Sequence, residues 1–130
     1  MGLIYLDTCL VIYLVEDNLI WSGRLRARMA TEAAQGFAIS PLVAMECLVG
    51  PLRSGNQEVE RTIRAALGGF AMLAIENVFE AAARLRAHFR LKTPDALHLA
   101  CAQHHGCAAF WTNDRRFEAA GGAFVMTLGA

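Results

Sequence analysis

Residues 3–15 read LIYLDTCLVIYLV, an apolar run that an aspartate and a threonine interrupt before it resumes. The first four of these residues are typical of a buried strand of a parallel sheet. Asp7 is of a type that often caps helices, so we expect a helix over residues 8–17. A strand that passes through a carboxylate directly into a helix begins a β-α unit, with the acid at the carboxyl end of the strand.

The same alternation continues and predicts a sheet covered by helices. Further strands are expected at residues 37–40, 70–75, 107–112 and 123–128. Further helices are expected at residues 21–35, 41–49, 56–68, 78–89, 94–106 and 114–120. We therefore predict an α/β fold, a three-layer α/β/α sandwich whose central, mostly parallel sheet has four to five strands. Its 130 residues suit one domain, 1–130.

Several helix boundaries rest on particular residue types. Ser40-Pro41 and Thr93-Pro94 each predict a capping side chain followed by a first-turn proline. Gly50-Pro51 predicts the end of the first of these helices, and Gly106 the end of the second. Residues spaced four apart predict the buried face of the helix at 21–35, namely Trp21, Leu25, Met29 and Ala33. An apolar face is also expected on the helix at 78–89, from Val78, Phe79, Ala82, Leu85 and Phe89.

The composition is apolar. Hydrophobic residues (AVILMFWYC) make up 55% of the chain, above the roughly 45 to 50% typical of soluble domains, so some apolar surface should remain for a partner. No apolar stretch approaches the roughly 20 residues that cross a bilayer, and no basic segment precedes the first apolar run. We therefore expect a cytoplasmic protein without membrane contact.

The four cysteines lack paired spacing and lie in apolar surroundings, which favours reduced core residues. A zinc site is the alternative for Cys101, His104, His105 and Cys107. Three of these side chains would have to face one point from the end of a single helix, which argues against zinc.

Four acids stand at a strand's carboxyl end or early in a helix, where open α/β sheets hold their ligands: Asp7, Glu46, Asp95 and Asp114. Any single aspartate there could simply stabilise a helix start. Glu46 differs, because it interrupts the apolar run 42–49. A carboxylate in such surroundings is costly unless it reaches solvent, is paired or binds a metal.

Four carboxylates in one cleft repel each other, and a hard divalent cation such as Mg²⁺ or Mn²⁺ relieves that repulsion through oxygen ligands. One or two such ions can activate water and stabilise the charge that develops on a phosphodiester. The sequence therefore predicts metal-dependent phosphodiester hydrolysis.

The chain balances 12 basic against 12 acidic residues. With the four site acids neutralised by metal, 12 basic residues would face eight acidic ones, an excess of four. A basic rim around the site can thus be formed from Arg24, Arg26, Arg28, Arg84, Arg86, Arg90, Lys92, Arg115 and Arg116, although a solvated helix face remains the alternative for each group.

Together these residues resemble the PIN-domain pattern. The resemblance rests on Asp7-Thr8 after a strand, Glu46 after Ser40-Pro41, the stretch TPDALHLA at 93–100 and the stretch TNDRRF at 112–117, and it spans nearly the whole chain. A compact chain of this kind is similar to VapC-type toxins of bacterial and archaeal toxin-antitoxin pairs. The resemblance implies a hydrolase, a metal-dependent endoribonuclease that cuts single-stranded or loop RNA.

The resemblance also assigns roles. It implies that the catalytic and metal-binding residues are Asp7, Glu46, Asp95 and Asp114, the last often acting through water. Thr112 matches the polar residue beside the fourth acid, and we expect it to bind substrate together with Arg115 and Arg116. The family commonly has Ser or Asn two positions after the first acid, whereas this chain has Cys9.

For partners, the resemblance implies RNA and an antitoxin of VapB type. The antitoxin should lay an apolar helix or extended tail into a groove between the early helices, with a basic or polar side chain approaching the acids. Apolar residues at 11–15 and 42–49 further favour a homodimer. Alternatives are another magnesium-dependent phosphoesterase and a non-catalytic PIN-like binding module. The presence of all four acids argues against the second.

Overall fold

The computed structural model describes residues 2–32 and 35–129, and its centre is a sheet that starts with the N-terminal strand. Within these residues five strands pair in the order β3-β2-β1-β4-β5, and every pair is parallel. The strands are β1 (Leu3–Leu6), β2 (Gly36–Ile39), β3 (Ala71–Met72), β4 (Ala109–Thr112) and β5 (Val125–Thr127). The carboxyl ends of the two central strands, β1 and β4, therefore meet at one edge of the sheet.

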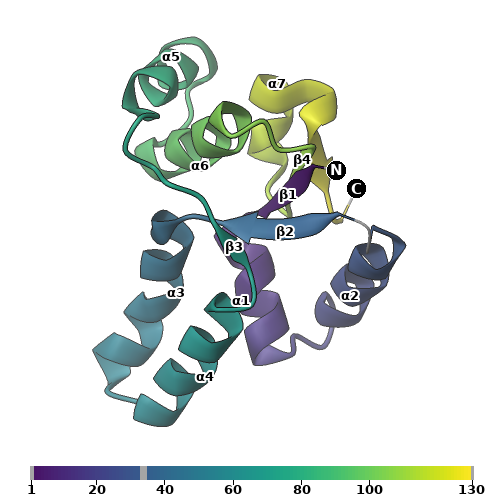
Figure 1. The fold of residues 1–130 in the computed structure, drawn as a ribbon, viewed down its shortest axis with the longest axis vertical. Coiled ribbons are helices and arrows are strands. Elements are labelled where there is room, and N and C mark those ends of the chain that lie inside the picture. The colour runs from purple at the N-terminus through teal and green to yellow at the C-terminus, as the bar shows by residue number, and fades with distance from the viewer. Residues whose placement is uncertain (1, 33–34, 130) are drawn as a thin grey trace.

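Helices cover both faces of the sheet, as Figure 1 shows. One side carries α1 (Thr8–Glu16), α2 (Ser22–Thr31), α3 (Pro41–Ser54) and α4 (Gln57–Leu67). The other carries α5 (Phe79–Phe89), α6 (Thr93–His104) and α7 (Glu118–Gly121). Short 3₁₀ turns occupy Arg115–Phe117 and Gly122–Phe124. The predicted α/β/α sandwich is confirmed.

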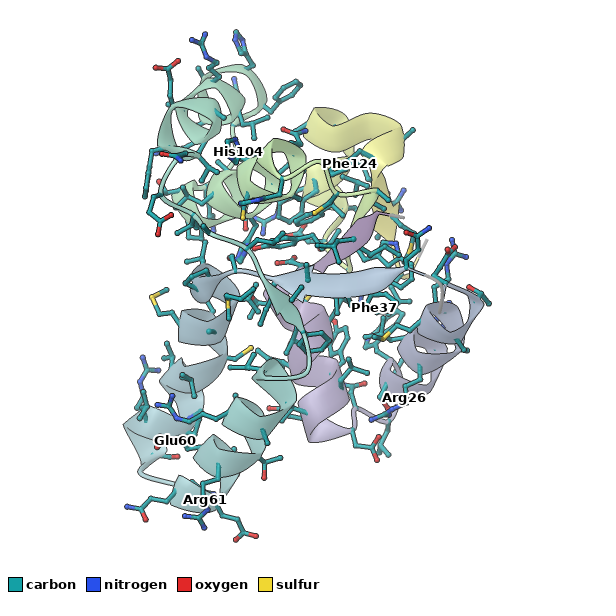
Figure 2. All side chains as sticks on the ribbon, in the orientation of Figure 1. Arg26, Phe37, Glu60, Arg61, His104 and Phe124 are labelled. Carbon is teal, nitrogen blue, oxygen red and sulfur yellow. The ribbon has the colours of Figure 1, made fainter. Side chains whose placement is uncertain are left out.

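The core lies where β1 and β4 face helices on both sides. Tyr5, Leu6 and Phe110 on these strands are completely buried, as are Val11 on α1 and Leu99 on α6. Such strands are apolar throughout because neither face meets water. Figure 2 shows side chains filling the space between the sheet and the helices, with charged residues such as Glu60 and Arg61 at the outer tip of α4.

Helix α3 runs past the end that the sequence predicts. It continues through Gly50 and Pro51 to Ser54, and Gly55 then closes it with a φ of 73°, in the left-handed region that glycine adopts easily. Pro51 removes one hydrogen bond from the helix interior. Its ring is buried, so packing against the core stabilises the longer helix.

The predicted capping side chains were also wrong in two places. Ser40 occupies the N-cap position of α3, but its hydroxyl bonds the Tyr5 hydroxyl at 2.8 Å instead of the helix backbone. Helix α6 begins one residue early, at Thr93, with Lys92 at its N-cap. The Thr93 hydroxyl accepts a hydrogen bond from Arg86 at 2.9 Å. In both cases a neighbouring side chain takes the hydroxyl that would otherwise cap the helix.

Other elements are shorter than predicted. Strand β3 has two exposed residues at the sheet edge, and the 3₁₀ turn at Gly122–Phe124 shortens β5. The helix expected at 114–120 divides into a 3₁₀ turn and α7. Helix α2 ends at Thr31, and the expected core position Ala33 lies outside the described residues.

The expected apolar face of α5 holds only in part. Val78 and Ala82 are buried, whereas Phe79 is 60% and Phe89 42% exposed. None of the described helices combines the length and the apolar character that a membrane crossing requires.

Candidate active site

The first acid is fixed where β1 passes into α1. Asp7 is 8% exposed and caps α1, its Oδ1 accepting from the Thr8 N–H at 2.8 Å. Its Oδ2 accepts from the Thr112 hydroxyl at 2.7 Å, because β1 and β4 are neighbours. The Cys9 thiol lies 3.7 Å from the same oxygen and donates a weak hydrogen bond to it. Each oxygen of Asp7 thus has a defined partner.

Thr112 links the first acid to the fourth. Its hydroxyl donates to Asp7 and accepts from the Asp114 N–H at 3.0 Å, and the residue is completely buried. Both functions of the hydroxyl are therefore used within the protein. This placement favours a positioning role over the substrate contact expected from the sequence.

Arg116 holds the fourth acid and reaches toward the third. Its guanidinium makes a forked contact with both carboxylate oxygens of Asp114, with Nε 3.0 Å from each, and Nη2 lies 3.7 Å from Asp95 Oδ2. The hydrogen bond from Arg116 holds the pKa of the Asp114 carboxyl below its usual range, against a smaller effect of burial. The positive charge stands between two of the candidate ligands.

Asp95 is the acid that the other acids crowd most. It lies in the first turn of α6 with its side chain 20% exposed. Burial raises the pKa of its carboxyl, Arg116 opposes that rise, and the negative charges of Asp7 and Asp114 add to it. A raised pKa caused partly by like charges indicates carboxylates that a cation would relieve.

Glu46 is paired inside the protein. Its Oε1 accepts from His98 Nε2 at 2.7 Å and from the Thr8 hydroxyl at 2.5 Å, with the side chain 28% exposed. Burial raises the pKa of this carboxyl, but the hydrogen bonds from His98 and Thr8 outweigh it, so the pKa lies below its usual range. Sequence reasoning missed the role of His98. Its position three residues after Asp95, on the same face of a helix, was the available signal.

The four acids, called the acid ring below, are linked in series through neighbouring side chains and form no preformed ion cage; Thr8 joins Glu46 to Asp7. Within the described residues, no three side chains from His, Cys, Asp and Glu converge closely enough to hold one ion. Thr112 instead joins Asp7 to Asp114, and Arg116 spans Asp114 and Asp95. The candidate donors are carboxylate oxygens, the type of ligand that Mg²⁺ and Mn²⁺ prefer.

The zinc alternative gains no support among the described residues. All four cysteines are free. His105 bonds the Ala74 carbonyl at 2.7 Å, and Cys101 lies 3.7 Å from the same carbonyl oxygen. These side chains tie α6 to the segment after β3.

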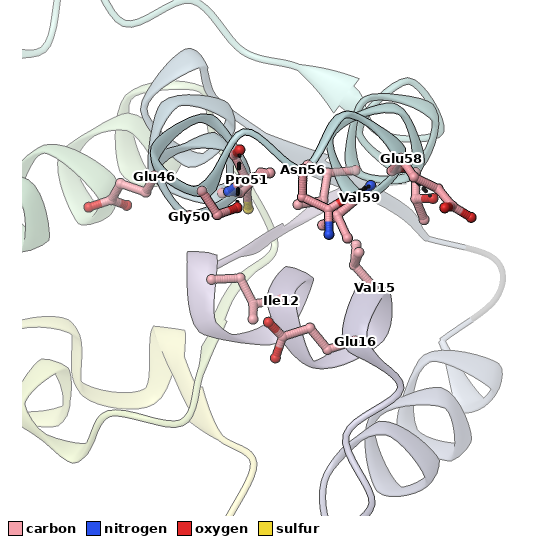
Figure 3. A pocket seen from close by; sticks show the side chains of 13 residues that line it. Ile12, Val15, Glu16, Glu46, Gly50, Pro51, Asn56, Glu58 and Val59 are labelled. Carbon is pink, nitrogen blue, oxygen red and sulfur yellow. Dashed lines mark hydrogen bonds between the residues drawn. The ribbon is translucent and has the colours of Figure 1, made fainter.

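A groove of about 460 Å³ between α1, α3 and α4 ends at the acid ring. It is lined by Ile12, Val15, Glu16, Glu46, Cys47, Gly50, Pro51, Ser54, Asn56, Glu58, Val59, Thr62 and Ile63. Figure 3 shows Glu46 on α3 at one end and Glu58 on α4 at the other, with Ile12 and Val15 of α1 between them. The lining is largely apolar and includes three acids, Glu16, Glu46 and Glu58.

A smaller hollow of about 250 Å³ lies on the other side of the ring, beside Asp95. Its lining is basic and aromatic, from Phe89, Arg90, Leu91, Lys92, Asp95 and Arg116. Arg90 has a φ of 57°, a left-handed conformation that is uncommon for residues other than glycine. The turn between α5 and α6 thus places two exposed cations next to a candidate ligand.

Comparison with known proteins agrees with this geometry. A family model described as PIN domain matches residues 4–123. A chain of a toxin-antitoxin complex from Klebsiella pneumoniae is 33% identical over 95% of this chain and 96% of that one, with a TM-score of 0.73. No protein with a curated functional description is significantly similar in sequence.

Two more distant structures share the fold. VapBC2 from Rickettsia felis, solved on a DNA fragment from its promoter, has a TM-score of 0.81 at 15% identity, over 96% of this chain and 98% of that one. VapC20 from Mycobacterium tuberculosis, described as a toxin that cleaves the sarcin-ricin loop, has a TM-score of 0.70 at 18% identity, over 91% and 95%.

Proposed function

This chain belongs to the PIN-domain family, and from that membership we propose that it is a metal-dependent endoribonuclease, the toxin of a VapBC-type toxin-antitoxin pair. The observation that carries the proposal is the ring of four acids at the carboxyl edge of β1 and β4. Burial, together with the charges of Asp7 and Asp114, raises the pKa of Asp95, which supports a cation at this ring. The relatives named above supply the toxin context.

We assign Asp7, Glu46, Asp95 and Asp114 to the metal, with Mg²⁺ or Mn²⁺ as the ion. When bound, the ion supplies a polarised water and positive charge toward the phosphodiester. The protein's own part is to orient the carboxylates of Asp7 and Glu46 through Thr8, Thr112 and His98, and to fix the backbone of Asp114 through Thr112. With the charge of Asp95 neutralised by an ion, Arg116 would be available to bind a phosphate.

RNA is the substrate that the surroundings of the ring favour. Arg90 and Lys92 line the hollow beside Asp95, and neither forms a salt bridge within the described residues. The half-exposed ring of Phe89 adds a surface on which an unpaired base can stack. Arg115, with its side chain 77% exposed, extends the basic edge next to Asp114. Single-stranded or loop RNA presents both phosphates and bases to such a site.

The groove at the other side of the ring is our candidate for the antitoxin. An apolar helix or tail would cover Ile12, Val15 and Val59, while Lys or Arg side chains would meet the acids at the two ends. Because Glu46 belongs to both the groove and the ring, a basic side chain there would compete with the metal. Bound antitoxin would thus inhibit cleavage.

A homodimer is the further partner we propose. Met45, Val49 and Leu52 form an exposed apolar stripe on α3, 55%, 42% and 57% exposed respectively. Their spacing of four and three residues places them on one face of the helix. Light scattering on the wild type and on Val49→Glu tests this, and a monomeric wild type would exclude the dimer.

The central test is cleavage of RNA. Purified protein is incubated with a pool of transfer and ribosomal RNA, with Mn²⁺, with a chelator, and with Asp7→Asn as the matched control. We expect new RNA ends at defined positions with wild type and Mn²⁺ only. Hydrolysis of small phosphate esters without RNA cleavage would instead assign a different phosphoesterase.

The toxin role has its own test. Expression of the chain alone should arrest growth of a bacterial host, while Asp7→Asn, or co-expression with the small gene beside it, should not. A wild-type chain that leaves growth unchanged, yet cleaves RNA in the test tube, would remove the toxin assignment and keep the nuclease.

A further inference from the structure

A chain of buried hydrogen bonds runs from the core to Glu46. Ser40 bonds the Tyr5 hydroxyl at 2.8 Å, and the Tyr5 hydroxyl bonds His98 Nδ1 at 2.7 Å. His98 Nε2 then bonds Glu46 Oε1 at 2.7 Å. Ser40 and Tyr5 are completely buried and His98 is 1% exposed, so water does not reach the part of the chain from Ser40 to His98. The four groups come from β1, α6 and the start and middle of α3.

The direction of the chain follows from the groups at its ends. An ionised Glu46 can only accept, so His98 Nε2 carries the proton in that bond. Burial raises the pKa of the Tyr5 phenol far above its usual range, so Tyr5 remains protonated and has one proton to donate. In a neutral imidazole Nδ1 accepts that proton, and the Tyr5 oxygen accepts from Ser40. Every hydroxyl and N–H of the chain then has a partner.

The other arrangements leave a defect. With the ring proton on Nδ1, the lone pair of Nε2 would face the Glu46 carboxylate, and two acceptors would repel each other. A doubly protonated imidazole would make Tyr5 donate to Ser40, and the Ser40 hydroxyl has no other hydrogen-bond partner within the part of the chain that the structure describes. A buried unpaired donor costs free energy, so the arrangement in which Nε2 donates to Glu46 and Nδ1 accepts from Tyr5 is favoured.

The two oxygens of Glu46 are treated unequally. Oε1 accepts from both His98 and Thr8, whereas Oε2 has no hydrogen-bond partner among the described residues. One oxygen is therefore saturated and fixes the orientation of the carboxylate. The other remains available to a ligand.

We propose that His98, oriented by Tyr5 and Ser40, is a positioning residue that holds Glu46 Oε1 and thereby leaves Oε2 for a divalent cation bound at the four acids. This inference rests on the proposed function. Residues that orient ligands of a metal are often worth about 10- to 100-fold in metal affinity or activity. Helix α6 would thus supply one ligand, Asp95, and orient another on a different helix.

The wild-type protein gives the first test, by ¹⁵N nuclear magnetic resonance of its histidine side chains without metal. We expect Nε2 of His98 to have the shift of a protonated imidazole nitrogen and Nδ1 that of an unprotonated one. The same experiment on Tyr5→Phe should show this preference weakened. A proton on Nδ1 of His98 in the wild type would overturn the proposal.

Substitutions give the second test, read by calorimetric titration with Mn²⁺. His98→Gln keeps an amide N–H near the position of Nε2, whereas His98→Met keeps the volume and removes the donor. His105→Gln is the matched control, because His105 lies at the end of the same helix and bonds only the Ala74 carbonyl. We expect His98→Met to raise the Mn²⁺ dissociation constant by about 10- to 100-fold, and His98→Gln and His105→Gln to stay close to wild type. Wild-type affinity in a folded His98→Met protein would overturn the proposal.

Asp7→Asn separates this inference from the proposed function. If Asp7→Asn loses Mn²⁺ binding while His98→Met retains it, only the role of His98 is wrong. If Asp7→Asn also retains Mn²⁺ binding, the metal site itself is wrong. Should His98→Met fail to fold, the wild-type and Tyr5→Phe spectra decide.

Discussion

Replacing Thr112 by valine removes one hydroxyl from the centre of the acid ring and leaves the shape of the side chain almost unchanged. That hydroxyl donates to Asp7 Oδ2 at 2.7 Å and accepts from the Asp114 N–H at 3.0 Å. Because Thr112 is completely buried, water cannot enter to replace it at Asp7. We expect Thr112→Val to destabilise the fold and to weaken metal binding.

The size of the effect follows from the two bonds. A hydrogen bond to a charged group contributes about 1.5 to 3 kcal/mol, and the half-buried Asp114 N–H adds up to about 1 kcal/mol, since water reaches it in part. The loss in the free energy of unfolding is thus about 2 to 4 kcal/mol. For a chain of this length the entropy of unfolding converts that into a fall in melting temperature of roughly 7 to 15 °C.

Thr127→Val is the matched control. Thr127 pairs with Thr112 in the β4–β5 register and is 8% exposed. Its hydroxyl donates a hydrogen bond to Glu118 Oε2 at 2.9 Å. Glu118 is 40% exposed, so solvent screens that bond and we expect a loss of only about 0.5 to 1 kcal/mol. Thermal unfolding without metal compares the two, with Thr112→Ser as the rescue. Equal losses for both valine variants would refute the role given to Thr112.

Three further results are expected. Asp95→Asn should abolish cleavage yet raise the melting temperature of the metal-free protein. The pKa of Asp95 is raised in the folded state, so its carboxylate lowers stability at pH values above that pKa, and the gain in melting temperature should shrink as the pH falls through it. A gain in melting temperature that persists at low pH would contradict this electrostatic cause. Arg116→Gln should tighten Mn²⁺ binding by a few-fold in calorimetry. The effect is modest because the Arg116 side chain is 60% exposed, so solvent screens its charge. Unchanged or weaker binding would mean that Arg116 does not compete with the ion. Arg90→Ala and Lys92→Ala should raise KM for RNA and reduce its salt dependence at unchanged kcat. The control Arg64→Ala, on α4 and paired with Glu60, should leave KM unchanged. Equal effects of all three substitutions would show that the hollow beside Asp95 does not bind RNA.

Local signals in the sequence predicted the elements that hold the ring. The strand Leu3–Leu6 and the helix that follows it agree with the structure, and α4 (Gln57–Leu67) agrees with the helix expected at 56–68. These are set by apolar runs and capping residues within a few positions of each other. The same alternation predicted a mostly parallel sheet with acids at its strand ends. The pairing of β1 with β4, which brings Asp7 next to Thr112, is known only from the structure.

Contacts between distant residues could not be read in the same way. Tyr5 and His98 are 93 positions apart, and nothing in a single sequence distinguishes a tyrosine that fixes a tautomer from one that only packs. The contact of Arg116 with Asp95 depends on how the turn after β4 meets α6. The continuation of α3 through Pro51 also depends on distant contacts, because the burial of Pro51 against α1 and α4 outweighs the helix break that a proline predicts.

The most direct measurement is anomalous X-ray scattering from crystals of the wild type soaked with Mn²⁺. We expect a manganese peak bounded by carboxylate oxygens of Asp7, Glu46 and Asp95, with Asp114 nearby and the Arg116 guanidinium turned away from Asp95. Glu46 should bind through Oε2 while Oε1 keeps its bonds to His98 and Thr8. A peak elsewhere, or an undisturbed Arg116 bridge at saturating Mn²⁺, would contradict the four-acid metal site.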